Sequence, residues 1–156
     1  MAGQESTPPL PLPLKLAATL LGAGLVPVMP GTCGTLAAAL PVFFLPEGAY
    51  PFILGGAALL ATLGCILISR RMGRADPGWF VLDEAAGFYV AAFWVAGPEA
   101  WRIAVAFLFF RIFDILKPWP IRRLEKVDGG LGIVLDDLLA GAYALGLASA
   151  AGAILS

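Results

Sequence analysis

The stretch from Phe109 to Gly141, FFRIFDILKPWPIRRLEKVDGGLGIVLDDLLAG, concentrates charge in an otherwise apolar chain. It carries ten of the charged residues, although the whole chain has only 10 Lys and Arg and 11 Asp and Glu and is 60% hydrophobic. Arg111, Asp114 and Lys117 are spaced three apart, which places them along one stripe of a helix. The Pro-Trp-Pro triplet after Lys117 ends this helix, because a residue before proline is pushed out of the α region. Charges at the ends of apolar helices are costly to keep, so we expect them to have a function.

The composition limits the chemistry that this chain can perform. The length of 156 residues suggests one domain, and the mean hydropathy of +0.88 is high for a soluble protein. The net charge of -1 provides no global field for nucleic acid, so no nucleic-acid partner is expected. Without any histidine, a Ser-His-Asp triad, a histidine-ligated metal and an imidazole base are all excluded. Any metal ligands must be carboxylates, which favour a hard cation such as Mg²⁺ or Mn²⁺.

The apolar segments predict an all-α fold. We expect residues 1–13, which are polar and rich in proline, to form a disordered tail, and residues 14–156 to form a single helical domain. The expected architecture is a compact bundle of about six helices, several of them embedded in the membrane. The apolar segments span residues 14–29, 35–45, 52–69, 80–97, 101–116 and 131–155.

The positions of the basic residues predict a membrane topology. Basic clusters at 70–74 and 117–126 follow two of the apolar segments, whereas the turns at 46–51 and 97–99 contain no Lys or Arg. Because basic loops stay in the cytoplasm, we expect a multi-pass protein whose carboxylates lie near the cytoplasmic face. The alternative is that some of these short helices are only the buried core of a compact bundle.

Two acidic pairs, Asp83-Glu84 and Asp136-Asp137, each begin an apolar helix and are followed by small residues. Small residues let helices approach closely, so the two pairs are expected to face each other. Neighbours on a helix point about 100° apart, so each pair can send one carboxylate to a metal and the other to a basic partner. The alternative is that these acids only stabilise the helix dipoles. Two pairs together with Asp114, in a chain so poor in charge, favour a metal site.

Arg111 and Lys117 are the basic residues best placed to bind an anion, since they share a helix face with Asp114. Arginine matches phosphate oxygens with two hydrogen bonds, and lysine acts as a point charge. The alternative for these two residues is simple ion pairing within the fold. For the basic residues at 122–126 the alternative is contact with anionic lipid.

The segment PGTCGT, residues 30–35, is expected to be a glycine-containing loop. Its glycines allow close approach of the backbone to a ligand, and the amides of Gly34 and Thr35 are expected to open the next helix, where an anion binds well. The alternative is a plain helix cap made by Thr32 or Thr35. Carboxylates, basic side chains and such a loop at a membrane face together suggest metal-assisted chemistry on a lipid phosphate.

Four blocks in a fixed order resemble the phosphatidylglycerophosphatase A family: PGTCGT (30–35), DPGWFVLDEAAG (76–87), FRIFDILKPWPI (110–121) and GGLGIVLDDLLAG (129–141). The resemblance implies an all-α, Mg²⁺-dependent phosphomonoesterase in the bacterial inner membrane. It implies that phosphatidylglycerophosphate is hydrolysed to phosphatidylglycerol and phosphate.

The resemblance also suggests a role for each polar residue. We expect the catalytic residues to be Asp83, Asp114, Asp136 and Asp137, with Asp114 as general base or nucleophile. The expected Mg²⁺ ligands are Asp83, Glu84, Asp136 and Asp137. The expected phosphate-binding residues are Thr32, Gly34, Thr35, Arg111 and Lys117.

One rival hypothesis is a small ion-coupled transporter subunit, because intramembrane carboxylates also serve proton pathways. The acids here lie at helix ends beside arginines, which fits phosphate better. The sequence leaves the oligomeric state open, a homo-oligomer included.

Overall fold

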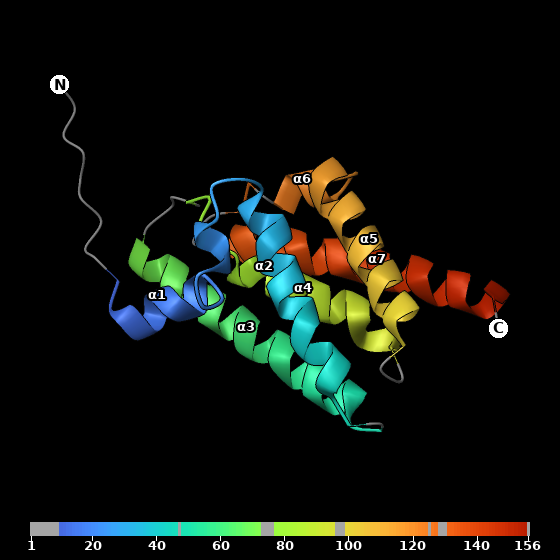
Figure 1. Cartoon of the computed structure of the whole chain (residues 1–156). Coiled ribbons are helices and arrows are strands. Elements are labelled where there is room, and N and C mark those ends of the chain that lie inside the picture. The colour runs from blue at the N-terminus through green and yellow to red at the C-terminus, as the bar shows by residue number, and fades with distance from the viewer. Residues whose placement is uncertain are drawn as a thin grey trace.

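The computed structural model describes residues 10–46, 48–72, 77–95, 99–124, 126–127 and 131–155, and every regular element within them is helical (Figure 1). The expected all-α class is therefore confirmed. The α-helices are α1 (Leu12–Ala18), α2 (Pro30–Ala39), α3 (Tyr50–Met72), α4 (Leu82–Ala91), α5 (Ala100–Leu116), α6 (Ile121–Leu124) and α7 (Leu131–Leu155). Three short 3-10 helices complete them, η1 (Ala23–Leu25), η2 (Leu40–Phe44) and η3 (Ala92–Trp94).

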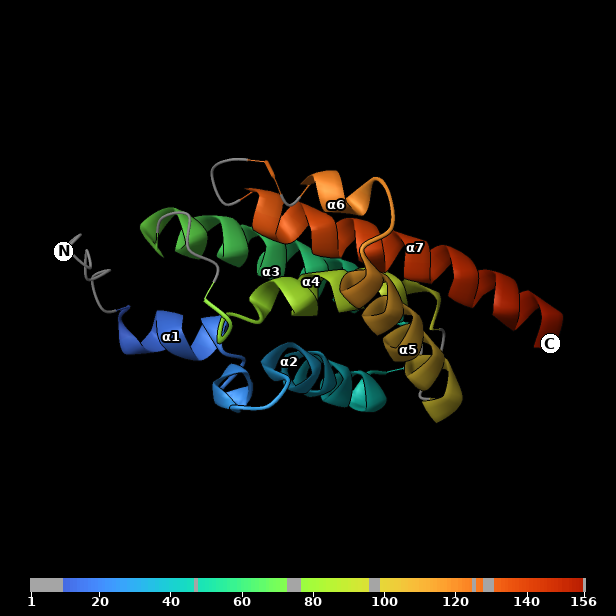
Figure 2. The same ribbon diagram turned by 90° about the horizontal axis from the view of Figure 1, so that it is seen from above.

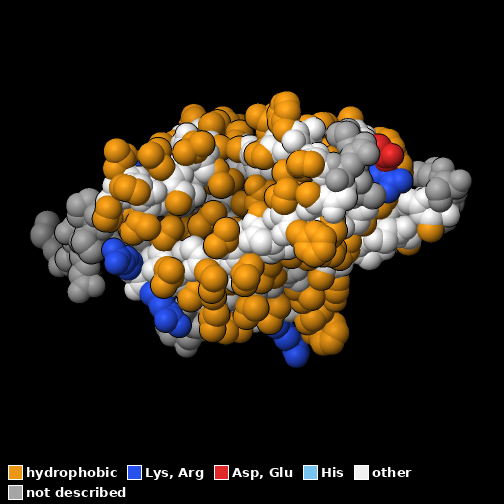
Figure 3. Space-filling view, turned by 90° about the horizontal axis from the view of Figure 1, so that it is seen from below, with side chains coloured by type: hydrophobic (Ala, Val, Ile, Leu, Met, Phe, Trp, Pro, Cys, Tyr) orange, Lys and Arg blue, Asp and Glu red, His pale blue; other side chains and the backbone are white. Residues whose placement is uncertain are grey.

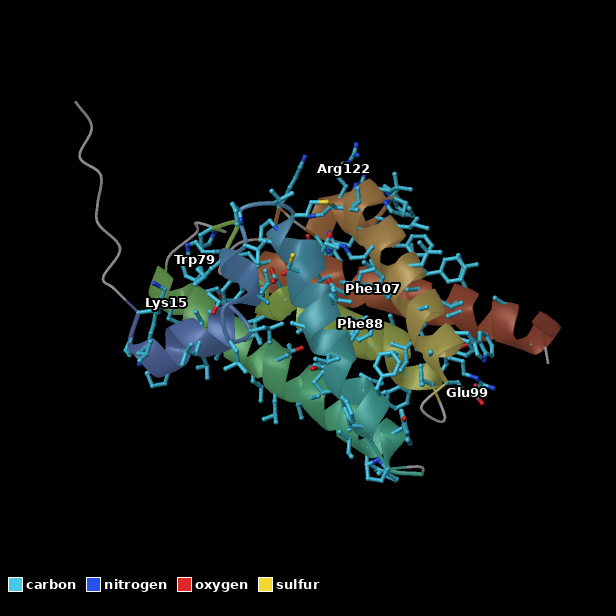
Figure 4. All side chains as sticks on the ribbon, in the orientation of Figure 1. Lys15, Trp79, Phe88, Glu99, Phe107 and Arg122 are labelled. Carbon is cyan, nitrogen blue, oxygen red and sulfur yellow. The ribbon has the colours of Figure 1, made fainter. Side chains whose placement is uncertain are left out.

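Helix α4 is the centre of the bundle. It packs against α2, α3, α5 and α7, and Figure 2 shows it between α2 on one side and α3 and α7 on the other. Most of its ten residues are buried, Phe88 completely, and Figure 4 places Phe88 in the middle of the bundle. The apolar character of this short helix therefore reflects burial in protein.

Two glycines bring α4 and α7 into backbone contact. A Cβ atom added to Gly141 would overlap the carbonyl oxygen of Gly87. A Cβ atom added to Gly87 would overlap the carbonyl oxygen of Asp137 and lie 2.6 Å from the ring of Phe110. Both glycines lie about one turn after an acidic pair, so the expected close approach of the two acid-bearing helices is confirmed.

Among the described residues, two helices are long and apolar enough to cross a membrane. They are Tyr50–Arg71, with a mean hydropathy of 2.2, and Leu131–Ala153, with a mean hydropathy of 1.6. The outer face of α3 exposes large apolar side chains, such as Phe52 (81% exposed) and Leu60 (71% exposed). Figure 3 shows hydrophobic side chains over most of one face of the molecule, with Lys and Arg near its rim. Exposed apolar area of this extent marks a membrane or protein contact.

The helices share one polar end. In Figure 1, α4 and α7 begin, and α3 and α5 end, toward the same side of the bundle. Figure 4 shows Arg122 on α6 and Glu99 at opposite ends of α5. Both acidic pairs lie near the beginning of their helices, so the fold brings them to the side on which Arg122 lies.

The structure corrects several details. The expected loop at residues 30–35 is wrong, because this segment forms the first turns of α2, with Pro30 at the first position and Met29 as N-cap. The alternative of a threonine cap is wrong for the same reason. Within the basic connector, residues 121–124 form α6. Residues 1–9 of the expected tail lie outside the described residues, and α1 begins at Leu12, two residues before the expected start of the domain.

Candidate active site

Three carboxylates from two helices form an acidic cluster. Asp83 and Glu84 come from the first turn of α4 and Asp137 from α7, and one oxygen of each lies within 4.8 Å of the others. Asp83 and Asp137 are each only 5% exposed. Asp114, near the end of α5, interacts electrostatically with both Asp137 and Glu84. So many acidic groups in one buried place require a compensating cation or proton.

The surroundings of Glu84 illustrate the need for a compensating cation or proton. Burial is the main cause of a raised pKa at Glu84, and the carboxylate of Asp114 raises it further, while Asp83 and Arg111 lower it. Positive charge or hydrogen-bond donors beside such a group favour its charged form.

Two basic side chains, one on α5 and one directly after it, border the acidic cluster. Nη1 of Arg111 donates a hydrogen bond to Oδ2 of Asp114 at 2.5 Å, and it lies 3.5 Å from Oγ1 of Thr35. Nζ of Lys117 donates to Oδ2 of Asp136 at 2.7 Å. Lys117 is the residue after α5 and has a left-handed backbone (φ 41°). The cluster thus has a cation on its Asp114 side and another on its Asp136 side.

The two acidic pairs behave differently. On α7, Asp137 joins the acidic cluster and Asp136 binds Lys117, which is the division that the sequence predicted. On α4, Asp83 and Glu84 both join the cluster. The structure therefore places Asp136 outside the group of three carboxylates, although we expected it among the metal ligands.

The beginning of α2 lies directly beside the acidic cluster. A Cβ atom on Gly31 would overlap Oε1 of Glu84 and come within 3.4 Å of Nη1 of Arg111. Pro30 has no N–H group, and the N–H of Cys33 already bonds the carbonyl of Met29. The N–H groups of Gly31 and Thr32 belong to the first turn, where a helix has no internal partner for them, so they are available to an anion.

Three buried polar atoms at this place have no hydrogen-bond partner. They are Oγ1 of Thr32, Oε2 of Glu84 and Nε of Arg111. They belong to side chains of α4 and α5 that border the acidic cluster and to the residue after Gly31 on α2, and leaving such atoms unpaired costs about 1–3 kcal/mol each, which indicates a ligand. Two of these atoms can donate to an anion and one can bind a cation, and a metal-bound phosphate offers both.

Contrary to expectation, Gly34 and Thr35 do not offer their amides to an anion but have structural roles. Their amides lie in the interior of α2, where the helix uses them. Gly34 provides space, because a Cβ atom there would lie 2.5 Å from Cβ of Val81. The buried hydroxyl of Thr35 donates to the carbonyl of Gly31 at 2.8 Å and faces Arg111. Gly31 is the residue that sequence reasoning missed. Its position directly after Pro30 could have identified it, because proline is favoured at the first position of a helix.

Comparison with known proteins agrees with this arrangement. The family described as Phosphatidylglycerophosphatase A matches residues 16–151. Phosphatidylglycerophosphatase A of Escherichia coli (strain K12) is 36% identical over 140 residues, which cover 86% of this chain and 81% of that protein. The protein of the same name from Haemophilus influenzae is 40% identical over 138 residues, covering 85% of each chain.

A third relative has a different name. A protein of Bacteroides thetaiotaomicron named "Putative phosphatidylinositol-3-phosphatase" is 34% identical over 137 residues, covering 82% of this chain and 86% of its own. No solved structure matches the fold closely enough to be compared. The family match covers α2, α4, α5 and α7, the helices that build the acidic cluster and its basic neighbours. This chain belongs to the phosphatidylglycerophosphatase A family and is a phosphatase.

Proposed function

We propose that this phosphatase removes the terminal phosphate of phosphatidylglycerophosphate in a Mg²⁺-dependent reaction and releases phosphatidylglycerol and phosphate. The observation that carries the proposal is the cluster of two buried carboxylates and one partly buried carboxylate beside the unpaired atoms of Glu84 and Arg111, with a further unpaired atom of Thr32 at the start of α2. The names of the relatives from Escherichia coli and Haemophilus influenzae support the choice of substrate.

The donor set fits Mg²⁺. It consists of carboxylate oxygens, which hard cations prefer, and one oxygen from each of three residues lies within 4.8 Å of the others. Asp83, Glu84 and Asp137 would hold the ion, and Asp136 would act on it only indirectly, by fixing Lys117. When bound, Mg²⁺ supplies a Lewis acid that withdraws charge from the phosphoryl oxygens.

The residues around the acidic cluster would orient and neutralise the phosphate. Arg111 offers its unpaired Nε, and Thr32 offers its hydroxyl and its amide, as donors to phosphoryl oxygens. Cations that face a transferring phosphoryl group stabilise the charge of the transition state. Arg111 also fixes Asp114, which we propose as the general base that takes a proton from the attacking water. An acyl phosphate trapped on Asp114 would instead make this residue the nucleophile.

An apolar groove fits the lipid part of the substrate. It has a volume of about 400 Å³, lies between α1, α3 and α4, and is lined by Leu60 and Leu67 of α3 and by Leu82 and Ala85 of α4. Leu82 and Ala85 flank the acidic pair of α4 in the sequence and share one face of this helix, so the groove lies on the same helix turn as Asp83 and Glu84 but on a neighbouring face. An acyl chain in this groove would hold its headgroup beside the acidic cluster.

The proposed setting is the bacterial inner membrane, crossed more than once, with the site on the cytoplasmic face. Two helices have the length and composition of spans. Arg70 and Arg71 end the first of them, and Lys117 lies at the polar end of the bundle, as expected for a cytoplasmic side. Membership of a family of phosphatases argues against the transporter hypothesis.

A second candidate substrate is phosphatidylinositol 3-phosphate, favoured by the name of the Bacteroides relative. This lipid has the same order of groups as phosphatidylglycerophosphate, a diacylglycerol, a phosphodiester, a polyol and a terminal phosphomonoester. Purified protein in neutral detergent should release phosphate from phosphatidylglycerophosphate faster than from phosphatidylinositol 3-phosphate. Release from neither lipid would refute the proposed function, and the reverse order would reassign the substrate.

Gly31→Ala tests the position of Glu84. The new Cβ would occupy the place of the Glu84 carboxylate oxygen, so we expect activity to fall by at least about tenfold, as for a displaced metal ligand. Gly56→Ala on α3 is the matched control, because nothing lies within 4 Å of its Cβ position. Equal phosphate release by the two variants would contradict the placement of α2 over the acidic cluster.

A further inference from the structure

A basic pocket lies beyond the end of α5, next to the acidic cluster. Its volume is about 410 Å³, and its lining includes the side chains of Lys117, Trp119, Arg122, Arg123 and Lys126. Within the described parts of the chain, no carboxylate forms an ion pair with Arg122, Arg123 or Lys126. Three cations that pair with no carboxylate among the described residues surround one hollow and form a site suited to an anion.

The fold holds this pocket in place. The left-handed Lys117 and the following Pro-Trp-Pro segment turn the chain sharply out of α5 and into α6. Ile121, the first residue of α6, is completely buried, and α6 packs on α7. Arg122 and Arg123 are therefore carried by an anchored turn, and Figure 4 shows Arg122 projecting from it at the outside of the bundle.

The pocket and the acidic cluster are connected through Lys117 and Asp136. Lys117 lines the pocket and donates a hydrogen bond to Asp136, whose neighbour in the chain, Asp137, belongs to the acidic cluster. The two sites are therefore adjacent through the series Lys117, Asp136 and Asp137, as a ligand with two anionic groups would require. Trp119 is 73% exposed and lies under the guanidinium of Arg123, 5.8 Å from the ring centre to Cζ. An exposed tryptophan beside cations is typical of the membrane interface.

We propose, on the basis of the proposed function, that this basic pocket binds the phosphodiester of the lipid substrate while the acidic cluster acts on the terminal phosphate. The substrate carries two phosphates joined by a glycerol unit, and only one of them is cleaved. Arg122 and Arg123 bind the phosphate that stays with the lipid, and Lys117 lies between the two groups. The pocket thus selects lipids whose phosphomonoester is separated from the diacylglycerol by a phosphodiester.

The double variant R122Q/R123Q tests this proposal. Rates are measured in neutral detergent micelles at a fixed mole fraction of phosphatidylglycerophosphate. We expect KM to rise at least about tenfold, because two charge-assisted contacts to the phosphodiester are lost, and kcat to change less than about threefold. The control R70Q/R71Q removes the same charge from the end of α3, outside the pocket, and should leave both constants unchanged.

Phosphatidic acid separates the substrate phosphodiester from a general attraction to anionic lipid, because its single phosphate is the terminal one. R122Q/R123Q should leave kcat/KM for phosphatidic acid within about twofold of the wild type. If the wild type does not cleave phosphatidic acid, the inhibition constant of this lipid against phosphatidylglycerophosphate serves instead and should stay equally constant. An equal loss for both lipids, or an unchanged KM for phosphatidylglycerophosphate, would overturn the proposal. Failure of the wild type to cleave phosphatidylglycerophosphate would refute the proposed function instead.

Discussion

Asp137→Asn should remove phosphatase activity without unfolding the protein. Asp137 supplies one of the three clustered oxygens, and even outer-shell partners of metal ligands contribute about 10- to 100-fold, so we expect a loss of more than about 100-fold in kcat. Asparagine keeps the shape and removes one negative charge from a place shared with Asp114 and Glu84. In metal-free protein the unfolding temperature should therefore stay equal or rise.

Asp136→Asn is the matched comparison, and its effect on stability should have the opposite sign. Asp136 is 4% exposed and binds Lys117, so its loss leaves a half-buried ammonium group without this partner. Breaking a fully buried pair costs about 3–5 kcal/mol, and Lys117 is 26% exposed, so we expect a smaller destabilisation. Thermal unfolding in detergent with EDTA measures both variants. Near-normal phosphate release by Asp137→Asn would show that the acidic cluster is not the reaction centre.

Gly141→Ala should separate the two helices that carry the acidic cluster. Its Cβ would overlap the carbonyl oxygen of Gly87, and this backbone atom moves only if α4 moves. Overpacking of this kind costs about 1–3 kcal/mol, and the shift would also pull Asp137 away from Asp83. We therefore expect lower unfolding temperature and lower activity together, measured by thermal unfolding and phosphate release.

Gly146→Ala on the same helix is the control. Nothing lies within 4 Å of its Cβ position, so the substitution should only gain helix propensity, about 1 kcal/mol in favour of the folded state. The two glycine variants of α7 should thus change stability in opposite directions. If Gly141→Ala were as stable and active as Gly146→Ala, the close crossing of α4 and α7 would be wrong.

The sequence predicts the helices best where apolar runs are long. The expected segments 52–69, 101–116 and 131–155 correspond to α3, α5 and α7, because each run is long and contains no proline. The segment 80–97 shows the limit of this reasoning. It forms the short, buried α4 and η3, since apolar composition alone does not tell protein from lipid as the surroundings of a helix.

The sequence identifies most residues of the site but not how their side chains are arranged in space. Scarcity of charge singles out Asp83, Glu84, Asp114 and Asp137, and the structure brings these four together. The sequence does not predict which way each side chain points, because that depends on how the helices cross. That is why the pairing of Asp136 with Lys117 appears only in the fold.

The beginning of α2 was misread for a local reason. A Pro-Gly-Thr sequence is typical of a turn, but proline is also favoured in the first turn of a helix, and burial against α4 decides between the two. Because the helix begins at Pro30, the amides without a partner inside the helix belong to Gly31 and Thr32 and not to Gly34 and Thr35.

The central claim is that the acidic cluster is a Mg²⁺-dependent phosphatase centre. The most direct measurement is phosphate release from phosphatidylglycerophosphate by purified protein stripped with EDTA, followed while Mg²⁺ is added back. We predict no release in EDTA, saturable recovery with Mg²⁺, and no recovery in Asp137→Asn. Full release in EDTA that does not respond to Mg²⁺ would contradict the claim.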